Sequence, residues 1–113
     1  MNNTPLTPEI QAEVDRDLAP IRVEIDAVDA QLLRLLNERA KLAQRVGEVK
    51  QKYDQPVYRP ERESVILEKI AAQNPGPLPT PTLQTLWREV MSACRAMEEP
   101  VKVAYLGPAG TYT

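Results

Sequence analysis

The chain has 113 residues, of which 42% are hydrophobic and 27% are charged, and this is enough for one modest globular domain. The formal net charge is −2 and the basic residues form no run, which argues against nucleic acid and acidic membrane surfaces as partners. The chain has no histidine, so mechanisms that use imidazole as a base or as a metal ligand are excluded.

The sequence also gives no sign of a metal centre or a cofactor site, because no cluster of cysteine, aspartate or glutamate has metal-ligand spacing. The single cysteine permits no intrachain disulfide and fits a reducing compartment. The opening MNNTPLTPE has no hydrophobic signal segment, and no apolar run approaches membrane-spanning length. We therefore expect a cytoplasmic protein that works without metal, cofactor or membrane.

Residues 1–19 are interpreted as an N-terminal extension. Within it, Thr7 suits the N-cap of a helix and Pro8 suits the first helical position. Pro20 leaves two possibilities open, since an interior proline removes a hydrogen bond and clashes with the preceding turn. It either kinks a helix that has already begun or is the first residue of the next one.

The stretch from Ile21 to Tyr53 contains no proline and a single glycine, and it predicts one long helix. Its apolar residues alternate steps of four and three, as in a packing seam: Ile21, Ile25, Val28, Leu32, Leu35, Leu42, Val46, Val49 and Tyr53. Such a helix of roughly 33 residues would be about 50 Å long, which is more than a single small domain covers. We therefore expect a twofold dimer in which two long helices cross antiparallel and share a core.

A stripe of small residues, Ala40, Ala43 and Gly47, lies beside this seam. A glycine inside a helix is less favourable than alanine by about 1 kcal/mol, so Gly47 needs a structural reason. We expect another segment of backbone to pack closely against the long helix there.

Arg39 occupies a position in the seam where the pattern expects an apolar residue, and a guanidinium there needs an anion. Lys50 follows about three helical turns later in nearly the same direction, so both side chains can reach one small anion. Arg22 is about 42 Å from Lys50 along the helix and can join them only from a second copy. Taken one by one, Arg39 is also explained as half of a structural ion pair with a neighbouring helix, and Lys50 and Arg22 as solvated surface charges.

Two shorter helices are expected after the long one. Pro56 and Pro60 break the chain, and Pro60 suits the first position of a second helix. The loop QNPGPLPTP follows, and then Thr80 as N-cap and Pro81 as first residue open a third helix that ends near residue 100. The last thirteen residues, VKVAYLGPAGTYT, alternate as a strand does before a glycine-rich turn, which suggests the opening of another domain.

Several of these stretches together resemble the all-helical chorismate mutases. IRVEIDAVDAQLLRLLNERAKLAQRVGEVK is similar to the first helix of that family, VYRPERE to the start of its second helix, and LWREVMSACRAME to its third. VAYLGPAGTYT is similar to the first strand and turn of prephenate dehydratase, and the order of the pieces is that of the bifunctional chorismate mutase/prephenate dehydratases. The implied domains are the extension 1–19, a chorismate mutase domain 20–100 and the truncated start of a dehydratase domain 101–113.

The resemblance implies an all-α fold, with a three-helix protomer, one very long first helix, an intertwined homodimer and a short strand-like C-terminal stub. It also implies the conversion of chorismate to prephenate, an intramolecular Claisen rearrangement in phenylalanine and tyrosine biosynthesis. That reaction needs no nucleophile, metal or cofactor. Holding the dicarboxylate in a compact conformation and stabilising charge on the breaking ether oxygen are sufficient.

By matched position, the resemblance assigns catalysis to Lys50, Arg39 and Glu98. Arg39 is expected to bind one carboxylate, Lys50 to reach a carboxylate and the ether oxygen, and a protonated Glu98 to face the same oxygen. The further substrate-binding residues are expected to be Arg22 from the partner protomer, Arg59, Arg62, Glu63, which accepts from the substrate hydroxyl, and Cys94. Arg59 stands where the family often has aspartate, and Cys94 where it has serine, a stronger donor.

Two other functions remain open from the sequence. An isochorismate-pyruvate lyase on the same helical fold would share the set of cations, but the dehydratase-like tail argues against it. A non-catalytic dimerisation or regulatory module of a shikimate-pathway enzyme would not need Arg39 or Lys50, and both are present.

Overall fold

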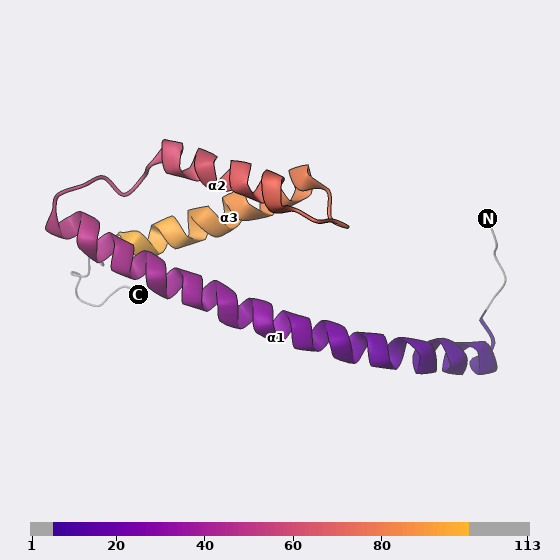
Figure 1. Cartoon of the computed structure of the whole chain (residues 1–113). Helices are drawn as coiled ribbons and strands as arrows, with labels where there is room; N and C mark the ends of the chain where they lie inside the picture. Colours follow the sequence, from indigo (N-terminus) through magenta and orange to yellow (C-terminus); the bar gives the residue numbers. More distant parts are fainter. Residues whose placement is uncertain (1–5, 100–113) are drawn as a thin grey trace, which may run out of the picture. The chain divides into compact units, whose positions relative to one another are not determined.

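A computed structural model describes residues 6–99, and within them the chain forms three helices and no strand (Figure 1). These are α1 (Pro8–Lys52), α2 (Pro60–Gln73) and α3 (Thr80–Glu98). The predicted all-α class with a very long first helix is confirmed for this part of the chain. The strand-like stub at 101–113 lies outside the described residues. The chain divides into two compact units, 1–35 and 36–113, and α1 contributes to both.

The described part of the first unit consists of the N-terminal part of α1. Thr7 caps this helix as predicted, because the amide of Ile10 donates to Thr7 Oγ1 at 3.1 Å and that of Gln11 donates to the Thr7 carbonyl at 2.9 Å. Pro20 lies inside α1, so it is not the first residue of the long helix, which has 45 residues. Proline has no amide hydrogen for the carbonyl of Arg16, and the exposed surface there leaves that carbonyl open to water. No helix in the described residues is both long and apolar enough to span a membrane.

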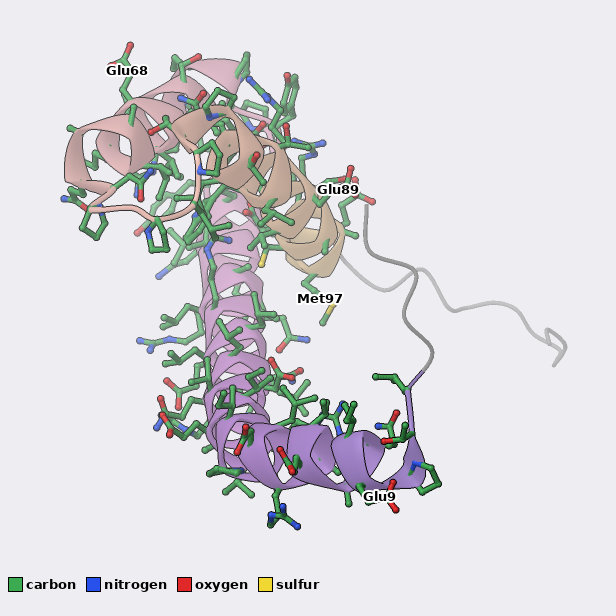
Figure 2. All side chains as sticks on the ribbon, turned by 90° about the vertical axis from the view of Figure 1, so that its right-hand side faces the viewer. Glu9, Glu68, Glu89 and Met97 are labelled. Carbon is green, nitrogen blue, oxygen red and sulfur yellow. The ribbon has the colours of Figure 1, made fainter. Side chains whose placement is uncertain are left out.

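The described part of the second unit contains the end of α1 together with α2 and α3. After Lys52 the chain turns through Asp54, whose φ of 56° is left-handed, and the amide of Gln55 donates to the Lys50 carbonyl at 2.7 Å. α2 begins at Pro60, as the sequence predicts. α2 and α3 lie side by side and antiparallel (Figure 1), and Gln84 Nε2 donates to the Leu67 carbonyl across them at 3.2 Å. Glu68, on the outer side of α2, points away from the protein (Figure 2).

The loop between α2 and α3 depends on Asn74, which sequence reasoning passed over. Its Nδ2 donates to the Leu78 carbonyl at 2.8 Å and to Thr80 Oγ1 at 3.0 Å, and its Oδ1 accepts from the Gly76 amide at 2.9 Å. The predicted N-cap role of Thr80 is wrong by one residue, because Pro79 is the N-cap of α3 and makes no side-chain cap. The hydroxyl of Thr80 accepts from Asn74 instead.

The core of the second unit is small and lies where α1 meets α3. Its buried apolar side chains are Ala43, Met91 and Cys94, and Gly47 is buried beside them. A Cβ added to Gly47 would lie 2.7 Å from the Cα of Glu98, which is closer than real Cβ contacts come. The expected close approach of backbone at Gly47 is therefore present, and the approaching segment is the last turn of α3.

We predict that Gly47→Ala lowers the stability of the protein, although alanine is the better helix former. Overpacking of a tight contact destabilises by about 1–3 kcal/mol, which exceeds the gain in helix propensity of about 1 kcal/mol. Urea unfolding followed by circular dichroism measures the difference. Gln44→Ala, at an exposed position of the same turn, is the control and should leave stability unchanged or raise it slightly. A Gly47→Ala protein at least as stable as the wild type would contradict the close approach.

Candidate active site

The second unit encloses a pocket of about 540 Å³ between its three helical segments. The walls come from the end of α1, the connection before α2, the first turns of α2 and the end of α3. The lining residues are Arg39, Leu42, Ala43, Val46, Lys50, Val57, Arg59, Arg62, Glu63, Ile66, Met91, Cys94, Arg95 and Glu98.

This pocket brings together all but one of the residues that the sequence singles out. Those assembled are Arg39, Lys50, Arg59, Arg62, Glu63, Cys94 and Glu98. Arg22 is exposed on α1 within the first unit and does not line the pocket. Cys94 is buried, and its thiol is a weak donor in the wall.

Lys50 already has two hydrogen-bond partners in the pocket wall. Its Nζ donates to Glu98 Oε1 at 2.8 Å and to the Val57 carbonyl at 2.8 Å. The side chains of Lys50 and Glu98 are only 19% and 16% exposed, so this ion pair is shielded from water more than a surface pair. An ammonium has three donors, and these two contacts leave one of them for a bound anion.

Arg39 is half-buried in the wall and makes no hydrogen bond or ion pair with any of residues 6–99. A half-buried guanidinium without a protein partner favours an anion bound from outside. Arg39 therefore has no ion pair within this part of the chain, and an ion pair with a neighbouring helix of a second copy stays the alternative explanation.

Arg59 makes two contacts with neighbouring side chains. Its Nη2 donates to Gln55 Oε1 at 2.9 Å, and its Nη1 lies 3.9 Å from Glu61 Oε2. Its Nε is buried and has no partner among the described residues. A buried donor without a partner is unfavourable, so Arg59 keeps one unused hydrogen bond at the wall of the pocket.

Sequence reasoning missed Arg95, which also lines the pocket. Its Nη1 donates to Glu63 Oε2 in an ion pair, and its guanidinium carbon lies 4.6 Å from the centroid of the Tyr58 ring. One signal was available, because Arg95 follows the core residue Met91 by four positions and so shares its face of α3.

The ionisable side chains give the pocket a positive charge in a chain that is negative overall. Five lining residues are cationic and two are anionic, an excess of three positive charges: Arg39, Lys50, Arg59, Arg62 and Arg95 against Glu63 and Glu98. A small anion with more than one negative charge therefore fits the pocket best. In the described residues, no group of three histidine, cysteine, aspartate or glutamate side chains is placed to hold a metal ion.

Comparisons with known proteins agree with this chemistry. A bifunctional chorismate mutase/prephenate dehydratase from Neisseria gonorrhoeae is 52% identical over 100 residues, which are 88% of this chain and 27% of that protein. One from Aquifex aeolicus is 50% identical over 101 residues, 86% of this chain and 28% of that protein. The chain thus spans between a quarter and a third of the length of these relatives.

Solved structures give the same result for the fold. A chorismate mutase (form II) from Thermus thermophilus superimposes with a TM-score of 0.71 at 36% identity, covering 73% of this chain and 93% of that one. The family model of chorismate mutase type II matches residues 21–99, a range that contains Arg22 and every residue that lines the pocket. The chain therefore belongs to the type II chorismate mutase family.

Proposed function

We propose that this chain is a chorismate mutase, an isomerase that converts chorismate to prephenate in phenylalanine and tyrosine biosynthesis. The observation that carries the proposal is the cationic pocket, in which Arg39 has no partner among the described residues while Lys50 keeps a donor unused. Chorismate is a dicarboxylate, and its charge matches the excess of positive charge. The reaction breaks and makes bonds within one molecule, so the pocket needs only to hold a compact conformation and to stabilise charge.

The contacts of each side chain support the roles that the resemblance implies. Arg39 binds one carboxylate, because its donors are unoccupied by residues 6–99. Lys50 exchanges its contact with Glu98 for a substrate carboxylate and the ether oxygen, and the carbonyl of Val57 keeps its ammonium in place. Arg62 adds positive charge to the lining of the pocket, while Arg59 Nε and the Cys94 thiol supply donors at the wall. No metal or cofactor takes part in any of these steps.

Lys50→Ala tests the central step of this proposal. Loss of one donor to a developing oxyanion lowers turnover by about 100- to 1,000-fold, so the variant should be nearly inactive. The decrease in chorismate absorbance, with prephenate identified as the product, measures turnover. Lys52→Ala is the matched control, since Lys52 is exposed and does not line the pocket. Equal turnover in both variants and the wild type would remove Lys50 from the mechanism, and an inactive wild type would refute the proposal.

Glu98 is proposed to lie at the ether oxygen beside Lys50, whose Nζ donates to Glu98 Oε1 at 2.8 Å in the free pocket. Glu98→Gln keeps the shape of the side chain, and its amide can donate a hydrogen bond to that oxygen. We therefore expect this variant to stay active. Turnover of chorismate, beside the exposed neighbour control Glu99→Gln, measures the difference. A loss of activity in Glu98→Gln but not in Glu99→Gln would show that the charge of Glu98 is needed.

We further propose that the protein works as a homodimer. A stripe of apolar residues along α1 is 44% to 58% exposed in the chain: Ile21, Ile25, Val28, Leu32, Leu35, Leu42, Val46 and Val49. A mostly apolar hollow lies beside it between α1 and α3, and Glu89 and Met97, which project from α3 (Figure 2), are among its lining residues. An uncovered apolar surface of this extent is typical of an interface, and a second copy covers it with the same residues.

In this dimer Arg22 binds a substrate carboxylate in the pocket of the partner protomer. Mixing refolded Arg22→Ala and Lys50→Ala proteins should then restore activity, because one of the two sites in each heterodimer carries neither substitution. Random pairing leaves about a quarter of all sites intact. A mixture of Arg39→Ala and Lys50→Ala is the control and should stay inactive, since these two residues share one pocket. No recovery in mixtures that contain heterodimers would show that Arg22 does not bind substrate in the pocket of the partner protomer.

The proposed domain layout retains residues 20–100 as the mutase and residues 101–113 as the start of a prephenate dehydratase domain, as in the bifunctional relatives. Residues 8–19 continue α1, so the extension joins the mutase through an unbroken helix. A cytoplasmic location remains a prediction from the sequence.

A further inference from the structure

Three side chains from three segments meet at one wall of the pocket. Glu63 in the first turn of α2 accepts an ion-paired hydrogen bond from Arg95 of α3, and Arg95 lies over the ring of Tyr58, which precedes α2. The side chains of Arg95 and Glu63 are 30% and 26% exposed, so the pair is partly shielded from water. Only one carboxylate oxygen of Glu63, Oε2, is used, and Oε1 accepts no hydrogen bond from residues 6–99.

A carboxylate in the wall of a pocket for a dianion is unfavourable unless its charge is compensated. By itself, the negative charge of Glu63 would weaken the binding of a dianion. Its free oxygen, however, can accept a hydrogen bond from a hydroxyl group of the substrate. Arg95 lies close enough to compensate that charge. Its bond to Oε2 also fixes the side chain of Glu63, since a charged hydrogen bond restricts the rotamer and leaves Oε1 in a single place.

Arg95 differs from Arg39 in that protein contacts hold its position. Arg39 has no partner in the described residues and is open to a ligand, whereas the guanidinium of Arg95 is bonded to Glu63 and covered on one face by an aromatic ring. A cation stacked on an aromatic ring and bonded to a carboxylate loses little freedom when a substrate arrives. These contacts suit a group that acts on Glu63 better than a group that binds substrate directly.

We propose that Arg95 is a positioning residue of this site, which acts through Glu63. It compensates the charge of Glu63 so that a dianion can enter, and it holds Oε1 ready to accept from the hydroxyl of the substrate. The ring of Tyr58, 4.6 Å from the guanidinium carbon, supports Arg95. The proposal rests on the proposed mutase function, because it assigns Arg95 a role in that reaction.

The test compares kcat and KM for chorismate in the wild type, Arg95→Met, Glu63→Gln and the double variant. Loss of a charged hydrogen bond corresponds to about a 10- to 100-fold decrease in kcat/KM, and we expect Arg95→Met to lie in that range, with a raised KM. In the double variant the loss should be no larger than in Glu63→Gln alone, since Arg95 then has no carboxylate to act on. Arg88→Met, an exposed arginine on the same helix, should match the wild type.

Two further variants separate positioning from packing. Arg95→Lys keeps the positive charge but lacks the planar guanidinium. Its KM should therefore be close to that of the wild type, while its kcat should stay below the wild-type value. Tyr58→Leu should raise KM in the same direction as Arg95→Met, and Tyr58→Phe, which keeps the ring, should raise it less. Circular dichroism shows whether Arg95→Met folds. If it does not, Arg95→Lys and the Tyr58 variants still test the proposal.

The experiment distinguishes a failure of the inference about Arg95 from a failure of the proposed mutase function. Independent, multiplicative effects of Arg95→Met and Glu63→Gln would overturn the inference, because Arg95 would then act directly on the substrate. Equal kinetics in Arg95→Met and Arg88→Met would overturn it as well. In both cases the wild type turns over chorismate, so the proposed function stands. An inactive wild type would overturn the proposed function together with this inference.

Discussion

The contact between the backbones of α1 and α3 at Gly47 determines the geometry of the whole site. Because residue 47 has no side chain, the last turn of α3 reaches the surface of α1, and Glu98 comes within 2.8 Å of Lys50. The same approach brings Cys94 and Met91 into the small core and Arg95 to the wall of the pocket. A larger residue at 47 would separate the helices that provide opposite sides of the site.

In the free pocket, carboxylates of the protein pair with two of the cations, as the carboxylates of a ligand would. Lys50 is paired with the carboxylate of Glu98, and Arg95 with that of Glu63, so each of these cations already has an anionic partner. Five cations so close together would repel one another without such partners, and the two glutamates keep them ordered before a substrate binds. Arg39 has no such partner among the residues described, so its hydrogen-bond donors are available to a ligand.

The sequence predicts the parts of this structure that depend on local chemistry. Thr7 and Pro60 start helices because capping and proline geometry act over a few residues, and the spacing of Arg39 and Lys50 places both in the pocket through helical periodicity alone. The predicted cap at Thr80 was wrong because Asn74, six residues earlier, takes its hydroxyl. Arg95 was missed because its role depends on Glu63 and Tyr58, which are distant in sequence. Pro20 could not be decided locally, and the structure places it inside α1.

The continuity of α1 between Arg39 and Lys50 has a consequence for how this family can diverge. One residue inserted between them turns the second cation by about 100° around the axis and shifts it by about 1.5 Å, which removes it from the pocket. Substitutions at the outward positions of this segment leave both side chains where they are. This stretch can therefore vary in composition at its outward positions, but its length is fixed, and changes in the number of residues are tolerated only in the loops on either side of α2.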